Sequence, residues 1–249
     1  MSGHSKWSTI KRKKGASDAQ RAKIFTKVAR EMSVAVKQGG ADPSSNSKLR
    51  DCIAKAKSVN MPNDNIDRCI KKAAGGDDKN NYEELMYEGY GPCGVAVMVE
   101  TLTDNRNRTA GDLRHYFDKC GGNMGQNGCV SFLFNQLGVV VAENPDNIID
   151  EEKALEDSLE VDAEDIEYED EVIQFFTGIA DVSAVREALE KKNYKIASAQ
   201  VEYLPTTETA IDDPDMQVKM SRLLDMLEDN DDVQNVWHNW DAPETDDEE

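Results

Sequence analysis

The stretch GVVVAENPDNIIDEEKALEDSLEVDAEDIEYEDEVIQFFTGIADVSAVREALEKKNYKIASAQVEY, residues 138–203, alternates between two hydrophobic patterns. Short apolar runs indicate strands, and segments with apolar residues three or four positions apart indicate helices. The expected elements are a strand over 139–142, a helix over 146–158, strands over 166–169 and 172–177, a helix over 182–191 and a strand over 195–203. A β-α-β-β-α-β order is that of a ferredoxin-like split, so this stretch predicts one such domain.

The sequence on either side of this domain predicts a sheet built from two separate pieces. The expected elements before it are strands over 82–90 and 95–102, a helix over 107–119 and a strand over 130–134. After Pro205, residues 215–228 have helical spacing, and a last strand passes through Val233 and Val236. The strand over 130–134 is not followed directly by a helix and strand that would complete its domain. We therefore expect the C-terminal helix and strand to complete this domain, with the ferredoxin-like domain inserted between the two pieces.

Three helices are expected in the first 77 residues. Ser17 and Gln20 form a capping box that opens the first helix, which ends at Gly39 and Gly40. Asp42 followed by Pro43 predicts the start of the second helix, and Pro62 that of the third. The expected fold class is therefore α+β and multi-domain: a helical N-terminal domain plus two α+β domains, the last ferredoxin-like and inserted in the middle one.

The predicted boundaries follow from these elements. They are 1–77 for a basic helical domain, 78–135 plus 207–240 for an α+β middle domain, 136–206 for the inserted acidic domain, and 241–249 for an acidic tail that we expect to be disordered.

Charge is divided unequally between these regions. The 249 residues carry a net charge of −20. Residues 1–76 hold 17 Lys and Arg against 6 Asp and Glu, a net charge of +11, whereas residues 77–249 carry −31. A basic module within an acidic chain can still bind phosphate, because it releases the counterions condensed on a polyanion. The sequence therefore predicts nucleic-acid binding by the helical domain.

The candidate nucleic-acid-binding residues combine basic side chains with one aromatic ring. They are His4, Lys6, Trp7, Lys11, Arg12, Lys13 and Lys14, continued on the first helix by Arg21, Lys23, Lys27 and Arg30. The basic side chains would neutralise phosphates while Trp7 stacks on an unpaired base. The alternative interpretation is a solvated basic tail whose Trp7 packs on the first helix.

A second candidate lies in the polar turn TDNRNRT, residues 103–109. Arg106 and Arg108 would contact a phosphate or RNA at the N-terminus of the following helix. The alternative is that Asp104 or Asn105 caps this helix while both arginines pair with acidic neighbours.

Catalysis, cofactors, metals and membranes are not indicated. Gly89, Gly91 and Gly94 match a dinucleotide-binding spacing, but a strand follows them where that motif needs a helix, so we expect a hairpin turn. His115 and His238 have no nearby nucleophile in sequence, and we expect no enzyme. The five cysteines, none in C-x-x-C spacing, predict buried, reduced thiols. No apolar run is long enough for a membrane span and the first 14 residues do not resemble a secretory signal, which predicts a cytoplasmic protein.

Several longer motifs resemble those of the YebC/PmpR family, which also includes mitochondrial translational activators. They are Gly3-His4-Ser5-Lys6-Trp7, Lys14-Gly15-Ala16, Asn60-Met61-Pro62, Tyr87-Glu88-Gly89-Tyr90-Gly91-Pro92, Thr103 to Thr109, and Gly121-Gly122-Asn123. The resemblance spans nearly the whole chain and implies a three-domain fold with the last domain inserted in the middle one. Bacterial members are commonly described as DNA-binding transcriptional regulators.

These observations predict a non-enzymatic nucleic-acid-binding regulator of gene expression, of the DNA-binding transcriptional type. The alternative is a ribosome-associated translation factor that binds ribosomal RNA, with ribosomal proteins as partners of the acidic domains. Neither hypothesis requires a membrane or a small-molecule substrate.

Overall fold

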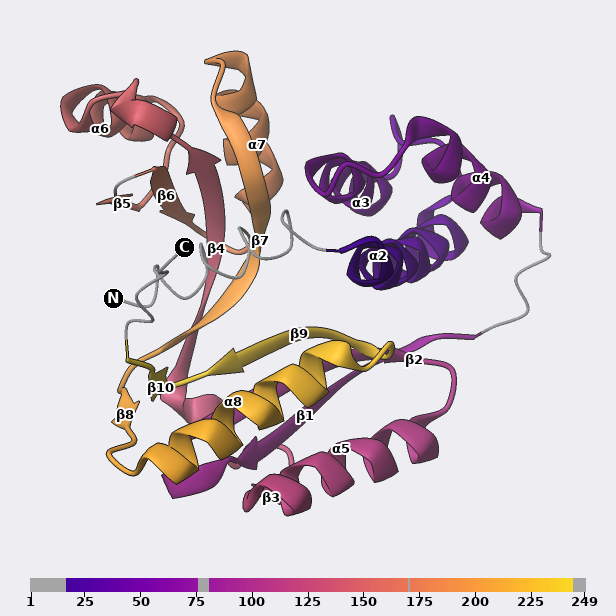
Figure 1. Ribbon diagram of the computed structural model, residues 1–249. Coiled ribbons are helices and arrows are strands. Elements are labelled where there is room, and N and C mark those ends of the chain that lie inside the picture. The colour runs from indigo at the N-terminus through magenta and orange to yellow at the C-terminus, as the bar shows by residue number, and fades with distance from the viewer. Residues whose placement is uncertain (1–16, 76–80, 170, 244–249) are drawn as a thin grey trace. The chain divides into compact units, whose positions relative to one another are not determined.

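A computed structural model describes residues 17–75, 81–169 and 171–243 (Figure 1). The chain divides into two compact units, Met1–Lys79 with Gln136–Tyr203 and Asn80–Asn135 with Leu204–Glu249. An N-terminal helical domain is followed by sheet-containing domains, which confirms the predicted fold class. The three-domain boundaries stay a prediction, and most of the predicted acidic tail, residues 244–249, lies outside the described residues.

The N-terminal domain consists of helices α2 (Asp18–Gly39), α3 (Ser47–Ser58) and α4 (Asn63–Ala74). Ser17 and Gln20 form the predicted capping box, in which the Gln20 side chain accepts the Ser17 backbone N–H at 2.9 Å. One apolar stripe from each helix fills the shared core, in which Met32 and Leu49 are completely buried. Fully burying side chains of this size contributes about 1.5–3 kcal/mol each, which holds the three helices together.

The start of the second helix differs from the prediction. The helix begins at Ser47 rather than beside Pro43, because Asn46 supplies the cap: its Oδ1 accepts the Leu49 backbone N–H at 3.0 Å. The Asn46 side-chain amide also donates to the carbonyl oxygens of Ala35 and Gly40, both at 2.8 Å. Asn46 therefore joins the end of α2 to the beginning of α3.

The second unit contains a four-stranded sheet in the order β3-β1-β2-β9. Its strands are β1 (Glu83–Tyr90), β2 (Ala96–Thr103), β3 (Asn123–Met124) and β9 (Val233–His238), and its helices are α5 (Arg106–Cys120) and α8 (Pro214–Asp229). The core lies between the sheet and both helices, where Val97, Phe117 and Leu223 are completely buried. The C-terminal helix and strand thus complete this sheet, as expected from sequence. A short parallel pair, β8 (Thr209–Ala210) and β10 (Trp240–Asp241), also belongs to this unit.

The predicted strand over 130–134 is wrong. Ser131–Leu133 form a 3-10 turn, and strand β4 begins only at Phe134. The Val130 and Ser131 backbone N–H groups donate to the Glu88 carboxylate at 2.8 and 2.9 Å, so they are unavailable to a neighbouring strand. The fourth strand of the sheet is instead β3, which pairs with the end of β1.

The ferredoxin-like pattern predicted for 138–203 is observed. Strands β4 (Phe134–Glu143), β5 (Asp165–Glu169), β6 (Val172–Thr177) and β7 (Lys195–Pro205) form a sheet in the order β5-β6-β4-β7. Helices α6 (Glu151–Glu160) and α7 (Val182–Lys191) contribute to its core. Completely buried Val140, Ile173 and Phe175 come from the two central strands, whose near-continuous apolar runs made them recognisable in the sequence.

Helix α6 begins five residues later than expected. Asp146 and Asn147 have φ of 60° and 49°, the left-handed region that a helix cannot contain, and they lie in a 3-10 turn. Asp150 then caps the helix by accepting the Lys153 backbone N–H at 2.7 Å. The boundary is set by this cap, which helical spacing alone did not locate.

Two further expectations concern cysteines and membranes. All five cysteines are free, but Cys93 is exposed and so contradicts the expectation of buried thiols. It occupies the turn between β1 and β2 with φ of 57°. Within the described ranges, none of the helices combines the length and apolarity that a membrane crossing needs.

Candidate nucleic-acid interface

The first group of predicted contacts lies outside the described residues. It comprises His4, Lys6, Trp7, Lys11, Arg12, Lys13 and Lys14. Its role in binding stays a prediction.

The basic residues predicted on the first helix fall on two sides of α2. Lys23, Lys27 and Arg30 follow i, i+4, i+7 spacing, so they share one face, opposite the core residues Val28 and Met32. All three are partly buried. Arg21 lies on another face, is exposed, and pairs with Asp18 at 3.4 Å. The structure thus brings three of the four predicted cations together.

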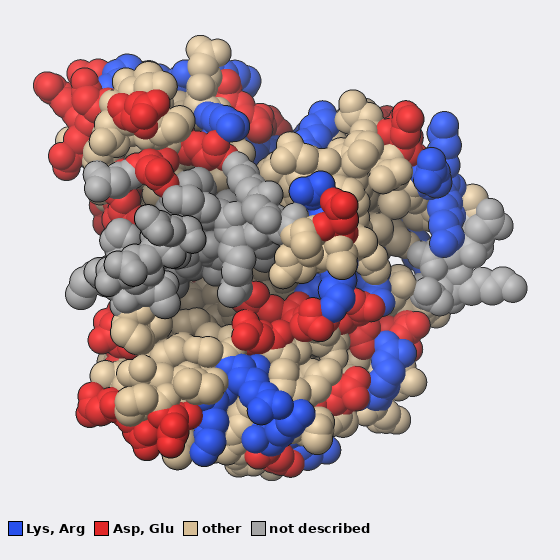
Figure 2. Space-filling view, viewed as in Figure 1, with Lys and Arg blue, Asp and Glu red and all other residues tan. Residues whose placement is uncertain are grey.

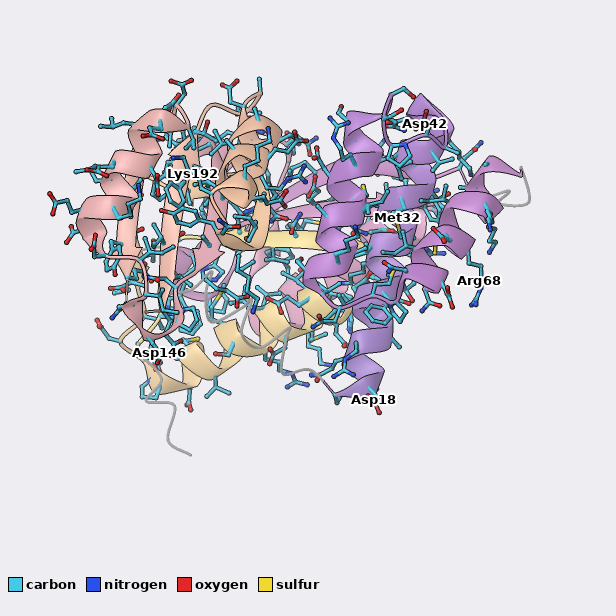
Figure 3. All side chains as sticks on the ribbon, turned by 90° about the horizontal axis from the view of Figure 1, so that it is seen from above. Asp18, Met32, Asp42, Arg68, Asp146 and Lys192 are labelled. Carbon is cyan, nitrogen blue, oxygen red and sulfur yellow. The ribbon has the colours of Figure 1, made fainter. Side chains whose placement is uncertain are left out.

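Helix α4 carries a basic surface that sequence reasoning missed. Arg68, Lys71 and Lys72 are exposed and follow i, i+3, i+4 spacing, opposite the buried Ile66. Figure 3 shows Arg68 extending away from the helices. None of the three forms an ion pair with a described residue. We call Arg68, Lys71 and Lys72 the α4 basic surface; its spacing was visible in the sequence.

The cations of α3 are used differently. Lys55 pairs with Glu31 of α2 at 2.7 Å, and Arg50 pairs with Glu187 of α7 at 3.1 Å. Arg50 also donates to the Pro43 carbonyl oxygen at 3.0 Å. These two side chains connect elements of the first unit and offer less charge to a ligand than the α4 basic surface does.

A shallow, open cavity of about 240 Å³ lies between α2 and α4, next to this surface. Its lining is mostly apolar, with polar side chains at Thr26, Asn65 and Arg68. The lining residues are Phe25, Thr26, Ala29, Met61, Asn65, Arg68 and Cys69. A flat, uncharged group could contact Phe25 and Met61 there while a phosphate attached to it reaches Arg68.

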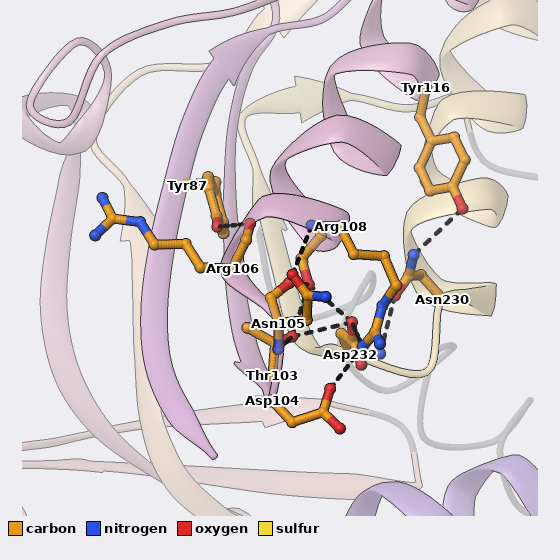
Figure 4. A network of polar contacts seen from close by, with 10 residues as sticks. Tyr87, Thr103, Asp104, Asn105, Arg106, Arg108, Tyr116, Asn230 and Asp232 are labelled. Carbon is orange, nitrogen blue, oxygen red and sulfur yellow. Dashed lines mark hydrogen bonds and ion pairs between the residues drawn. The ribbon is translucent and has the colours of Figure 1, made fainter. Parts of the chain in front are cut away.

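The second predicted site, at the start of α5, is a network that closes on a buried carboxylate (Figure 4). Arg108 Nη2 donates to Asp232 Oδ2 at 2.7 Å and to Asp104 Oδ1 at 2.9 Å. The Asp232 side chain is 5% exposed. These hydrogen bonds, first to Asp232 and then to Asp104, raise the pKa of Arg108. Arg108 is therefore a structural cation here, as in the alternative interpretation of this motif.

The remaining residues of the motif support the same network. The Thr103 and Thr109 hydroxyl groups donate to Asp232 Oδ2 at 3.2 and 2.8 Å, and Asn105 caps α5 by accepting the Arg108 backbone N–H at 3.1 Å. The motif thereby joins the turn between β2 and α5 to the turn between α8 and β9. Arg106 differs: it is exposed, and Figure 4 shows its side chain pointing away from the network.

A second buried carboxylate organises the glycine-rich loop before β4. Glu88 accepts backbone N–H groups from Gly128, Val130 and Ser131 at 2.7, 2.8 and 2.9 Å. Burial acts to raise the pKa of Glu88, but these hydrogen bonds lower it more, so the pKa lies below its ordinary value. Glu88 is thus an ionised structural anchor, not an acid poised to release a proton.

The described residues offer little for catalysis. His115 is exposed on α5, and His238 Nδ1 accepts the Trp240 backbone N–H at 3.2 Å, while burial lowers the pKa of His238 to about 4. The described part of the chain holds no group of three His, Cys, Asp or Glu placed to bind a metal. Gly91 lies at the β1–β2 turn, where an added Cβ would meet Met220 Sδ at 2.7 Å, so this glycine permits close packing. Gly91 and Gly94 lie in the hairpin connection between β1 and β2, as expected, whereas Gly89 lies within β1.

Two family models match this chain. Residues 5–76 match the model of the TACO1/YebC protein N-terminal domain, and residues 82–240 match that of the TACO1/YebC second and third domain. Together they extend over most of the chain.

Individual proteins are similar over nearly their whole lengths. A protein of Ruminiclostridium cellulolyticum is 58% identical over 249 residues, covering 100% of both chains, and one of Acetivibrio thermocellus is 56% identical, covering 96% of this chain and 99% of the other. Both are named "Probable transcriptional regulatory protein". The crystal structure of the conserved hypothetical protein Aq1575 from Aquifex aeolicus matches with a TM-score of 0.82 and 44% identity, covering 93% of this chain and 95% of that one.

Proposed function

This chain belongs to the TACO1/YebC family, and on that premise we propose that it is a non-enzymatic, cytoplasmic regulator of gene expression whose helical domain binds nucleic acid. The names of its relatives favour control of transcription, and we propose duplex DNA as the nucleic acid. The observation that carries the proposal is the α4 basic surface within a segment of net charge +11. Such a surface has no evident role in folding.

The physical basis is neutralisation of phosphate. Each Lys or Arg that contacts a phosphate releases condensed counterions, which favours binding to any sequence. The side chains of Arg68, Lys71 and Lys72 are exposed donors on one helix face, suited to a phosphate backbone rather than to base edges. The predicted contacts of Lys11, Arg12, Lys13 and Lys14 with phosphates would add to the same favourable free energy of counterion release. We therefore expect tight but weakly sequence-specific binding.

A second candidate function is contact with ribosomal RNA, and the cavity between α2 and α4 favours it. RNA loops present unstacked bases that proteins hold against aromatic side chains. Phe25 and Met61 would contact such a base, while Asn65 offers an amide for its edge and Arg68 a cation for its phosphate. Duplex DNA keeps its bases stacked and would leave the cavity unused.

The test compares both ligands on the full chain. Fluorescence anisotropy measures affinity for a labelled duplex of about 30 base pairs, and gradient sedimentation with purified ribosomes measures the other interaction, both at near-physiological salt. The proposal predicts that Arg68→Ala, Lys71→Ala and Lys72→Ala together weaken binding by about tenfold or more, since each lost contact to phosphate costs affinity. Changing Lys11, Arg12, Lys13 and Lys14 together to Ala should have at least the same effect.

A matched control removes three exposed cations from the second unit, Lys119, Lys219 and Arg222. Equal losses in the control and in the α4 variant would show that binding depends on net charge alone and would contradict the assigned interface. Tight binding to ribosomes together with weak binding to the duplex would indicate that the protein acts in translation and not in transcription. Lower affinity of Phe25→Ala for ribosomes, with duplex affinity unchanged, would assign the cavity to RNA.

A further inference from the structure

Helix α6 of the ferredoxin-like domain has its apolar and polar residues on unexpected sides. Its buried positions are Ala154, Asp157 and Ser158, whereas Leu155 and Leu159 are 53% and 72% exposed. Surface helices ordinarily bury their large apolar residues and expose their charged ones. Keeping two leucines in water costs the free energy that their burial would have supplied. This reversal suggests that the leucines serve something other than the fold.

The inner side of α6 is held by a polar cluster instead of by leucine packing. Asp157 accepts hydrogen bonds from Lys153 at 3.1 Å, Lys192 at 2.7 Å and the Tyr194 hydroxyl group at 2.9 Å. Burial acts to raise the pKa of Asp157, but these donors lower it more, so the carboxylate is charged and satisfied. The helix is thus fixed in place without Leu155 or Leu159.

The exposed leucines are adjacent to one another and surrounded by acid. Leu155 and Leu159 are four positions apart, so the two side chains lie on the same face. Among the described residues, three of the six large apolar side chains that are exposed fall within 148–159, the third being Ile148 at 77%. The exposed acids of the helix are Glu151, Glu152, Glu156 and Glu160. Figure 2 shows acidic side chains gathered with uncharged ones and a few Lys or Arg side chains in the region of α6. We call Leu155 and Leu159 with Glu151, Glu152 and Glu156 the α6 outer surface.

We propose that the α6 outer surface docks a basic amphipathic segment of a protein partner. Such a segment would place apolar side chains on Leu155 and Leu159 and Lys or Arg side chains on the surrounding glutamates. Helix-in-groove partners recognise residues at this i, i+4 spacing. The leucines supply affinity through burial, and the glutamates supply orientation and a fast encounter.

The negative charge of the α6 outer surface disfavours other binding partners. A symmetric contact between the α6 outer surfaces of two copies would bring the same glutamates face to face, and like charges disfavour that contact. Nucleic acid and anionic lipid surfaces would be repelled for the same reason. A basic partner is attracted, and it relieves the exposure of the leucines. This inference does not depend on what the helical domain binds.

The probe is a labelled 18-residue peptide of leucine and lysine at helical spacing, titrated into the full chain and followed by fluorescence anisotropy in 150 mM salt. Leu155→Ser with Leu159→Ser should weaken binding by about tenfold or more, because central interface residues carry most of the affinity. Val218→Ser is the matched control: Val218 is 68% exposed on α8 and should leave the affinity within about twofold. Equal affinities of the double variant and the unchanged chain would overturn the proposal.

Two further measurements separate the contributions. Glu151→Gln, Glu152→Gln and Glu156→Gln together should flatten the salt dependence of peptide binding, whereas unchanged salt dependence would refute the role of the glutamates. Sedimentation velocity of the unliganded chain tests the second copy as occupant. Self-association that Leu155→Ser with Leu159→Ser abolishes would overturn the assignment to a basic partner. Both leucines are exposed, so unchanged thermal unfolding verifies that each variant is folded.

Discussion

Arg68 of α4 and Arg108 of α5 are both arginines on a helix, but their surroundings differ. Arg68 is exposed beside Lys71 and Lys72, with no acidic partner among the described residues. Arg108 holds a buried carboxylate, Asp232, at 2.7 Å. A cation already paired with a buried acid contributes to stability, whereas an unpaired cation on a helix face can contribute to binding. The comparison predicts opposite consequences for changes at the two sites.

The largest effect on stability is expected for Asp232→Ala. Removing this carboxylate leaves the Thr103 and Thr109 hydroxyl groups and the Arg108 guanidinium without their common acceptor, and should lower the free energy of unfolding by about 3 kcal/mol. Urea denaturation measures the change. Asp104→Ala is the control, since Asp104 is the more exposed partner of Arg108 and should cost less than about 1 kcal/mol. Equal costs would mean that Asp232 does not anchor the network.

Arg108→Ala should lower stability but not nucleic-acid affinity, and Arg68→Ala should lower nucleic-acid affinity but not stability. We expect Arg108→Ala to lower the free energy of unfolding by about 1 kcal/mol, because Asp232 retains its two hydroxyl donors, and Arg68→Ala to change it by less than about 0.5 kcal/mol. Nucleic-acid affinity should fall for Arg68→Ala and stay unchanged for Arg108→Ala. Both variants are compared by urea denaturation and by anisotropy. A loss of affinity confined to Arg108→Ala would reverse the comparison.

Glu88 extends the comparison to a carboxylate held by backbone N–H groups rather than by a cation. Its pKa in the folded chain is lower than its ordinary value of 4.5. The ionised Glu88 carboxylate therefore contributes its full stabilisation of the folded state above about pH 4.5. This contribution is lost as the pH falls through the lowered pKa that Glu88 has in the folded chain. Between pH 7 and pH 3 the free energy of unfolding should fall less for Glu88→Gln than for the unchanged chain. Identical pH profiles would exclude Glu88 as a contributor.

Arg106→Ala should have the smallest effect. Its side chain points away from the Asp232 network, so the free energy of unfolding should change by less than about 0.5 kcal/mol. Thermal unfolding and anisotropy measure the two properties on one sample. A clear loss of affinity would restore the phosphate contact proposed for this residue and place a second binding surface on α5.

Much of the fold could be predicted because the relevant signals are local. The capping box at Ser17 and the apolar runs around Val140 and Ile173 depend only on neighbouring residues. The errors arose where a distant or unrecognised polar group intervened. Glu88 takes the backbone donors of Val130 and Ser131, some 40 residues away in sequence, and this interaction removes the expected strand.

The candidate site was less predictable, because charge patterns do not show which ions are paired. Nothing near Arg108 in the sequence indicates Asp232, which only folding brings beside it. The α4 basic surface was visible as a spacing but was overshadowed by the denser basic segment before α2. The exposed leucines of α6 could not be recognised either, since helical periodicity alone assigns such residues to a core.

The central claim, that the α4 basic surface contacts phosphate, is tested most directly by the salt dependence of nucleic-acid affinity. Binding of a labelled duplex is measured from 50 to 200 mM salt for the unchanged chain, for Arg68→Ala with Lys71→Ala and Lys72→Ala, and for Lys119→Ala with Lys219→Ala and Arg222→Ala. The account predicts that the slope of log affinity against log salt becomes shallower by about 1 for each lost phosphate contact in the α4 variant, and stays unchanged in the control. Three identical slopes would contradict it.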